Sequence, residues 1–576
     1  MPIRGFHLVP VKLGQIKVWR LIVSLHLNLD YTVPKQTALV GRAAFPKGTL
    51  CMLIYDELGT IFRDEDFADL FPPRGQPAEA PFRLALITVL QFLEGLSDRA
   101  AADAVRGRID WKYLLCLELD DPGFDYSILC EFRARLLDNE AAESRLFYKI
   151  VSVLKDHKLL KARTRQRTDA THVLAAVRDL GRLEKVIETL RAALNTLATA
   201  YPDWVRANIP PEWVDRYWRN SEWNRLPIKD EKIQELADAI GRDGHALLDA
   251  IWSDQSLEWM RSLPAVETLR RVWVQSFMTG ESGVRWRQPD NTPPSSLRIN
   301  SPYDPDARYG YKRNRITGWV GYKVHLTETC DEEGPNIITN VHTEPATTTD
   351  NNALPKIHKT LSEAELLPDR HLVDAGYVEA QQFVDSQREY GIELLGPPQG
   401  NGRWQHDQGT GFDIGHFQIN WEQEQVTCPM GKLNSSWKPR VDGRGNDVIH
   451  VAFLKSDCAQ CTSLSQCTKS NVPRRTLNIK PRELHEALQN ARRRLNTQDF
   501  KAEYKKRSGI EGTLSQGVRA FGLRRSRYVG MAKTRLQHLA TAAAINLARA
   551  AAWLEGHTLE KTRCSAFARV MRALPT

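Results

Sequence analysis

The sequence predicts an α/β protein with a mixed sheet, a helical N-terminal domain, a helical insertion and a β-rich insertion. Apolar residues recur at helical spacing along 82–93, which indicates an amphipathic helix. Residues 321–328 alternate apolar and polar, and a second apolar run at 337–341 follows a proline turn, which is typical of a β-hairpin. Beyond the hairpin, helix and strand patterns alternate as far as residue 395, an order that favours a mixed sheet.

The length of the chain excludes a single ordinary domain. It has 576 residues, of which 42% are hydrophobic and 26% are charged. This composition is typical of a folded chain with ample apolar surface for its cores, and it excludes a disordered or a disulfide-stapled protein. No run of about 18 uninterrupted apolar residues occurs, so we expect no membrane-spanning helix.

The patterns divide the chain into eight parts. Residues 1–51 show no sustained periodicity, so we expect a poorly structured N-terminal extension there. Helical patterns dominate the next hundred or so residues, and the first strand-like run is 167–173. In order, the expected parts are the extension 1–51, a helical domain 52–158, a first strand within 159–180, a helical insertion 181–299, a mixed-sheet part 300–400, a β-rich insertion 401–480, basic helices 481–560 and a tail 561–576.

Positive charge gathers at the C-terminal end of the chain. Residues 482–576 contain 19 Lys and Arg against seven Asp and Glu, an excess larger than the net charge of +9 of the whole chain. Such an excess favours a polyanion, nucleic acid first, as the partner, although a solvated basic surface is the alternative. Arg524, Arg525 and Arg527 offer phosphate neutralisation in this part.

Three acids stand at informative places. Asp169 lies within the first expected strand, Asp374 ends another strand before a helix, and Glu511 lies in the basic helical part. Three carboxylates that converge from two strands and a helix would bind a divalent cation, and two Mg²⁺ ions held in this way promote phosphodiester displacement. For any one of these acids, a capping or surface role is the commoner outcome.

The helix that carries Glu511 has a sharper pattern. Tyr504, Arg507 and Glu511 lie three and four residues apart, which places them on one helical face. There Arg507 can clamp a phosphate while Glu511 holds a metal. The alternative is an ordinary amphipathic helix with a surface ion pair. The usual phosphate-binding loop, the serine-hydrolase elbow and the metalloprotease motif do not occur, so we expect no nucleotide cofactor.

These motifs together resemble bacterial insertion-sequence DDE transposases, which have an RNase H-like catalytic domain. The segment His371–Tyr377 resembles the second-acid motif of that family, and Tyr504-x2-Arg507-x3-Glu511 is similar to its Y-x2-R-x3-E-x6-K helix. The segment Ser301–Tyr309, followed by Trp319–His325, resembles its second-strand region. The helical patterns between Gly95 and Leu136 look like its N-terminal domain.

The resemblance implies a complete function. Asp169, Asp374 and Glu511 would be the catalytic ligands of Mg²⁺ or Mn²⁺, Tyr504 and Arg507 would support DNA, and 52–158 would bind transposon ends. The family's lysine falls on Val518 here, so either Arg519 beside it would take its place or that phosphate contact would be missing. The implied activity is cleavage at terminal inverted repeats and strand transfer into target DNA, by a homodimer, in the bacterial cytoplasm at the nucleoid. The alternatives are a non-catalytic DNA-binding regulator and an RNase H-fold nuclease without strand transfer.

A cluster of cysteines forms a second candidate site, in the β-rich insertion. Four thiolates in a turn-rich segment can hold a tetrahedral Zn²⁺. Only one C-x2-C pair occurs, so four unligated thiols are the alternative. The cluster consists of Cys428, Cys458, Cys461 and Cys467.

Overall fold

The computed structural model describes residues 9–557 apart from 14–15, 21–24, 26, 29, 140, 223–225, 282, 313–316, 399–403 and 408–410, and it gives only the backbone of residues 9–20. The expected tail 561–576 lies outside this part of the chain. None of the helices in the described residues is both long and apolar enough to cross a membrane.

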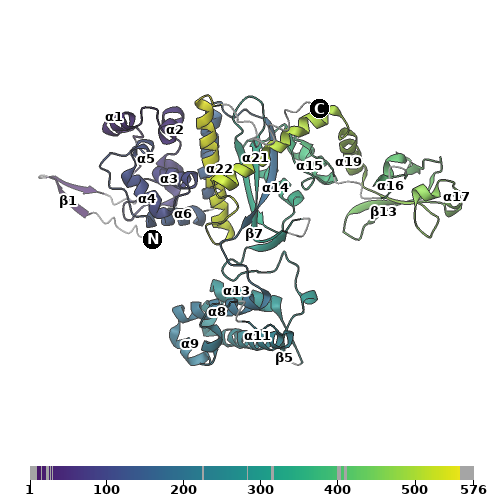
Figure 1. Cartoon of the computed structure of the whole chain (residues 1–576), viewed down its shortest axis with the longest axis horizontal. Coiled ribbons are helices and arrows are strands. Elements are labelled where there is room, and N and C mark those ends of the chain that lie inside the picture. Colours follow the sequence, from purple (N-terminus) through teal and green to yellow (C-terminus); the bar gives the residue numbers. More distant parts are fainter. Residues whose placement is uncertain are drawn as a thin grey trace, which may run out of the picture.

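A mixed six-stranded sheet lies at the centre of the described residues (Figure 1). Strand β3 pairs antiparallel with β7 on one side and parallel with β9 on the other. Beyond β9, β10 continues the parallel half, while β8 and β6 both pair antiparallel with β7. The strands are β3 (Arg165–Leu174), β6 (Arg308–Tyr311), β7 (Gly318–Thr329), β8 (Ile338–Pro345), β9 (Arg370–Leu372) and β10 (Glu393–Leu395). The predicted hairpin and the predicted alternation of helix and strand are confirmed.

Helices cover both faces of this sheet. Ala170 of β3 packs into a core with α14 (Asp350–Glu363), whereas Val173 belongs to a core with α21 (Gly509–Ala520) and α22 (Met531–Leu554). Because neighbouring residues of a strand point to opposite faces, Arg167 and Asp169 lie on the α21 face with Val173. Helix α15 (Ala380–Tyr390) connects β9 to β10 and packs beside α14.

The N-terminal helices share a core with the last helix of the sheet part. Figure 1 shows α22 between the N-terminal helices and the sheet, and the buried side chains of α3, α7 and α22 form one continuous cluster. Ser97 caps α4, because its hydroxyl accepts the Ala100 N–H at 3.2 Å. The helices are α2 (Leu50–Leu58), α3 (Pro81–Glu94), α4 (Asp98–Gly107), α5 (Ile109–Leu114), α6 (Ser127–Asp138) and α7 (Arg145–Asp156), with short 3₁₀ turns at Asp64–Leu70 and Ala142–Ser144.

The expectation of a poorly structured extension over 1–51 is wrong for its second half. Helix α1 spans Lys35–Ala44, and Leu50 already belongs to α2. The Thr37 hydroxyl is buried and donates to the Leu117 carbonyl at 2.7 Å, which ties α1 to the helical domain. The helix is short and only weakly apolar, so periodicity alone could not reveal it. Nearer the N-terminus, β1 (Val9–Leu13) and β2 (Ile16–Arg20) pair as a hairpin.

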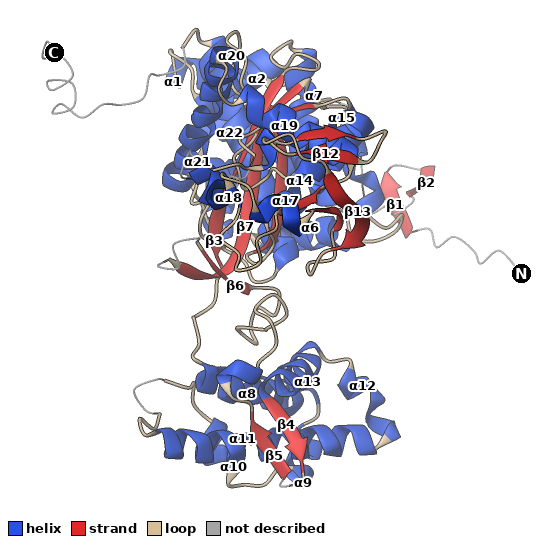
Figure 2. Ribbon diagram, turned by 90° about the vertical axis from the view of Figure 1, so that its right-hand side faces the viewer, coloured by secondary structure: helices blue, strands red, loops and turns tan. Residues whose placement is uncertain are grey.

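The helical insertion has a core of its own. Figure 2 shows it below the sheet, to which loops join it. Its buried side chains, among them Leu190, Ile240 and Trp273, form a cluster separate from the sheet cores. Its elements are α8 (Arg182–Ala200), α9 (Pro202–Asn208), α10 (Trp213–Tyr217), α11 (Asp230–Ser253), α12 (Glu258–Arg261), α13 (Pro264–Ser276), β4 (Phe277–Gly280) and β5 (Gly283–Trp286), with 3₁₀ turns at Gln255–Leu257 and Pro289–Asn291.

The remaining elements lie between β10 and α22. The β-rich insertion contains a two-stranded and a three-stranded sheet around a small core that includes Phe417, Val451 and Leu477. Basic helices then return the chain to the central sheet. The elements are α16 (Trp404–Asp407), a 3₁₀ turn (Ile414–His416), β11 (Gln418–Asn420), β12 (Gln425–Thr427), β13 (Asn434–Val441), β14 (Asp447–Phe453), α17 (Lys455–Ala459), α18 (Leu464–Cys467), β15 (Thr476–Ile479), α19 (Arg482–Arg494), α20 (Gln498–Tyr504) and a 3₁₀ turn η7 (Lys505–Ser508).

Gly321 lets β7 approach β3 closely at the end of their antiparallel pairing. Its φ is +152°, and a Cβ there would lie 2.1 Å from the Val173 carbonyl oxygen. We expect Gly321→Ala to destabilise the fold by about 3 kcal/mol, because a strained backbone and a clash with main-chain atoms add together. Gly107→Ala is the control, since nothing lies within 4 Å of its Cβ position. Urea unfolding measures both; equal stability of the two variants would contradict the close approach.

Candidate functional site

Two of the three predicted acids meet through the parallel pairing of β3 and β9. Arg165, Gln166 and Arg167 pair with Arg370, His371 and Leu372. Continuing this register by two residues sets Asp374 beside Asp169. Asp374 lies just past the end of β9, where its Oδ1 accepts the Gly376 N–H at 2.7 Å. The strand pairing, and not the separation in sequence, therefore brings these two carboxylates to one edge of the structure.

Glu511, the third acid, joins them through Arg507. One guanidinium nitrogen of Arg507 lies 2.9 Å from Asp169 Oδ2, and another lies 3.4 Å from Glu511 Oε1. The Asp169 and Arg507 side chains are only 17% and 15% exposed, whereas that of Glu511 is 66% exposed. Arg507 therefore links the buried first acid on β3 to the exposed third acid on α21.

The three acids interact electrostatically. Burial raises the pKa of Asp169 to about 6, the Arg507 guanidinium opposes this rise, and the charges of Asp374 and Glu511 add to it. Burial lowers the pKa of Arg507, but the carboxylates of Asp169, Asp374 and Glu511 outweigh burial and raise it. Asp169 is thus an acid that gives up its proton less readily than an exposed one, and a cation beside it favours its charged form.

A fourth carboxylate beside the site was missed by sequence reasoning. A Cβ on Gly376 would lie 3.0 Å from Asp374 Oδ1 and 3.1 Å from Asp350 Oδ2, so the two carboxylates flank this glycine. Lys323 of β7 pairs with Asp350 at 2.8 Å. Asp350 begins a helix, where an acid is the ordinary choice for capping, so the sequence carries no signal that sets it apart.

A buried tyrosine lies under the Asp374 loop. The Tyr377 N–H donates to the Asp374 carbonyl at 3.2 Å, and the Tyr377 hydroxyl lies 2.6 Å from His325 Nδ1. His325 Nε2 in turn lies 2.9 Å from Glu344. Burial raises the pKa of Tyr377, and nearby acids, Asp350 first, raise it further, so it stays a neutral phenol. This chain of hydrogen bonds fixes the loop that presents Asp374.

The residues predicted to contact DNA fall into two groups. Tyr504 stacks on Phe500 with ring centroids 5.4 Å apart, and Arg519 and Arg525 are exposed. Arg524 donates to the Thr171 hydroxyl at 2.8 Å, while Arg527 donates to the Leu96 carbonyl at 3.0 Å. Arg524 and Arg527 therefore hold parts of the chain together, whereas Arg519 and Arg525 present their charge to solvent.

The four clustered cysteines line one small cavity of about 30 Å³ in the β-rich insertion. The Lys432 N–H donates to Cys428 Sγ at 3.3 Å. Burial raises the pKa of Cys467 to about 11, Arg475 opposes the rise, and the other three thiols contribute to it. The structure thus brings Cys428, Cys458, Cys461 and Cys467 together. In the described part of the chain, no three or more His, Cys, Asp or Glu side chains are placed so that they could hold a metal ion, the acids and these thiols included.

Two family models match the chain. One, described as a transposase DDE domain, matches residues 427–551, and the other, described as a transposase domain of the DUF772 type, matches residues 42–135. Both matches indicate an insertion-sequence DDE transposase. The two matches indicate DNA transposition in general as the function, and binding to DNA with it. Glu511 and the cysteine cluster lie within the first match, whereas Asp169 and Asp374 lie outside both. No curated protein and no solved structure matches the chain.

The raised pKa of Asp169 predicts a pH dependence of stability. The pKa of the Asp169 carboxyl is about 6 in the folded protein, against an ordinary value of 3.8, so the folded state binds more protons than the unfolded state. This carboxyl therefore stabilises the fold at low pH, and that stabilisation is lost as the pH rises through about 6. From about pH 5 to about pH 7, we expect the stability of Asp169→Asn relative to the wild type to increase by about 1 kcal/mol. Urea unfolding at both pH values measures this. Asp369→Asn, which removes a carboxylate that is 61% exposed, serves as the control; a pH-independent difference for Asp169→Asn would contradict the raised pKa.

Proposed function

We propose that the transposase cleaves DNA at the terminal inverted repeats of its element and joins the released 3′-hydroxyl to target DNA, with Mg²⁺ or Mn²⁺ held by Asp169, Asp374 and Glu511. One observation carries the proposal: β3 and β9 set Asp169 beside Asp374, and Arg507 ties Glu511 to Asp169. Three carboxylates from remote parts of the chain thus lie around one arginine.

The fold we propose for this catalytic part is RNase H-like. The order of the strands supports it: β8, β7 and β3 run antiparallel, and β9 and β10 then extend the other side of β3 in parallel, with α14 before β9 and α15 between β9 and β10. The first acid, Asp169, lies on the central strand. The second, Asp374, follows the strand parallel to it, and the third, Glu511, lies on a helix over the same sheet.

We propose that 159–180, 300–400 and 481–560 make up one catalytic domain and that 52–158 binds the DNA ends.

The chemistry of the donor set fits a divalent cation. Carboxylate oxygens are the ligands that Mg²⁺ and Mn²⁺ prefer, and Asp169 is buried beside two further acids, where a cation favours its charged form. When bound, the cation supplies a Lewis acid and a positive charge for phosphodiester chemistry. Glu511 is the exposed member of the set, so its side chain has room to turn toward the other two.

The chain's own residues would hold DNA around these acids. Arg507 neutralises Asp169 in the structure, and its fork of donors suits a phosphate oxygen equally well. Within the described residues, the side chains of Arg519 and Arg525 are exposed and do not make contacts like those of Arg524 and Arg527, so they are the better candidates for the DNA backbone. Because two transposon ends have to be joined to one target, we propose that a homodimer acts on DNA.

The proposal predicts that Asp374→Asn separates binding from cleavage. We expect this variant to bind a duplex with the terminal repeat as tightly as the wild type does, because the one contact of the Asp374 side chain in the fold described above is the hydrogen bond from the Gly376 N–H. With Mg²⁺ we expect it to nick that duplex at least about a hundredfold more slowly, because a ligand of the cation is lost. Gel assays of binding, nicking and joining to a plasmid measure this. Asp369→Asn, at the other end of β9, is the matched control.

The outcomes of this assay separate the alternatives. Nicking by Asp374→Asn at the wild-type rate would rule out the proposed site. DNA binding by the wild type without any Mg²⁺-dependent nicking would favour a non-catalytic regulator. Nicking without joining of the ends would favour a nuclease.

We also propose that the four thiols of the β-rich insertion hold a structural Zn²⁺. They line one small cavity, and the N–H···S hydrogen bond to Cys428 is of a kind that stabilises a thiolate ligand. Zinc binding requires the four side chains to move from their places in the structure, where they do not form a metal site. We expect about one zinc per purified chain, lost in Cys461→Ser and kept in Cys130→Ser, whose thiol is exposed on α6. Metal analysis that finds no zinc in the wild type would rule it out.

A further inference from the structure

A buried carboxylate lies behind the acid site. Glu328 of β7 has no exposed surface, and it lies opposite Arg167 of β3 in the strand register. Arg167 donates to Glu328 Oε1 at 2.7 Å, and Arg549 of α22 donates to Oε2 at 2.8 Å. Removing such a carboxylate from water is costly, and here two guanidinium groups compensate for the loss. None of these three residues belongs to the predicted site.

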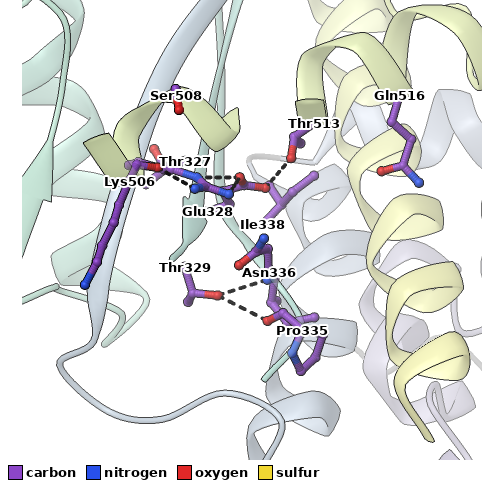
Figure 3. Close-up of polar contacts among 12 residues, drawn as sticks. Thr327, Glu328, Thr329, Pro335, Asn336, Ile338, Lys506, Ser508, Thr513 and Gln516 are labelled. Atoms are coloured by element: carbon purple, nitrogen blue, oxygen red, sulfur yellow. Dashed lines mark hydrogen bonds and ion pairs between the residues drawn. The ribbon is translucent and has the colours of Figure 1, made fainter. Parts of the chain in front are cut away.

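The network of Glu328, Arg167 and Arg549 forms hydrogen bonds to both ends of segment 506–513, which carries Arg507 and Glu511. Ahead of it, Arg167 Nη1 donates to the Lys506 carbonyl at 2.6 Å. Behind it, the Thr513 hydroxyl donates to Glu328 Oε2 at 2.5 Å and accepts from Arg549 at 2.6 Å. Figure 3 shows Glu328 between Lys506 on one side and Thr513 on the other. The segment 506–513 is thus held at Thr513 by Glu328 directly and at Lys506 by Arg167, the partner of Glu328.

The start of α21 is fitted to this network. A Cβ on Gly509 would lie 2.1 Å from Arg167 Nη1, so only glycine lets the helix approach the guanidinium. Thr513 is 2% exposed, and the Ile510 side chain beside it is completely buried. Because Arg167 and Asp169 lie two residues apart on the same face of β3, the distance between Asp169 and Glu511 is set through Arg167, Glu328 and Thr513.

We infer that Glu328, Arg167 and Thr513 are positioning residues, which set α21 on β3 so that Glu511 reaches the cation shared with Asp169 and Asp374. The inference rests on the proposed function, since it assigns to the network the alignment of that site. None of the three touches the acids directly. A buried network in which every polar group has a hydrogen-bond partner favours a single arrangement of its side chains. When one member is removed, a buried group loses a hydrogen-bond partner. Removing one hydrogen bond from the network, without removing a charge, should therefore loosen the attachment of α21 to β3.

The test uses Thr513→Val, which keeps the shape of the side chain and removes its hydroxyl. Thr88→Val is the matched control: Thr88 is also buried, and its hydroxyl donates to the Leu84 carbonyl at 2.7 Å in α3, away from the site. Thr513→Ser, which restores the hydroxyl, tests rescue. The readouts are the dissociation constant of Mn²⁺, followed by the paramagnetic resonance of the free ion, and hydrogen exchange of the amides of 506–513, both in the full chain.

We expect Thr513→Val to weaken Mn²⁺ binding by at least about tenfold and to speed exchange over 506–513, while Thr88→Val stays at the wild-type values and Thr513→Ser recovers most of the affinity. Wild-type affinity and wild-type exchange in Thr513→Val would overturn the inference and leave the proposed function intact. An equal loss of affinity in Thr88→Val would also overturn it, because stability alone would then explain the loss. Two results would overturn the proposed function and this inference with it. One is a wild-type protein that binds no Mn²⁺; the other is an Asp374→Asn variant that binds Mn²⁺ with the affinity of the wild type.

Discussion

The pairing of β3 with a strand on each side is the constraint on which the rest of the structure depends. On one side, β7 brings Glu328 opposite Arg167; on the other, β9 brings Asp374 beside Asp169. A shift of either pairing by one residue would turn the acids or the network to the wrong face of the sheet. The close approach at Gly321 is part of the same constraint, because it lies at the end of the pairing between β7 and β3.

The charged side chains at the site form two sets, an outer one around Arg507 and an inner one around Glu328. In the outer set Arg507 lies between Asp169 and Glu511, so the acids are paired by a side chain that has solvent on one side and the sheet on the other. In the inner set Glu328 is enclosed by Arg167, Arg549 and Thr513. The outer pairs are adjustable because Glu511 is exposed, whereas the inner ones are rigid because Glu328, Arg167 and Thr513 are buried and every member is hydrogen-bonded.

The sequence predicted the strands and their order well, because alternation and short apolar runs are local signals. It also placed Asp169, Asp374 and Glu511 on the elements that carry them, through a resemblance whose motifs are local too. It could not reveal Asp350, which looks like an ordinary helix cap, or Glu328 and Arg167, which look like polar residues of a strand edge. Their roles depend on contacts between residues 161 positions apart. Helix α1 was missed because its burial depends on Leu117 and Tyr113, and not on its own periodicity.

The shared core of the N-terminal helices and α22 has a consequence for synthesis of the protein on the ribosome. Helices α3 and α7 bury their apolar faces against a helix that is translated some 400 residues later, so the first part of the chain completes its core only when α22 emerges. A nascent or truncated product that lacks α22 keeps an exposed apolar face. The N-terminal helices and the part of the chain that carries Glu511 therefore complete their packing at about the same moment, once α22 has been made.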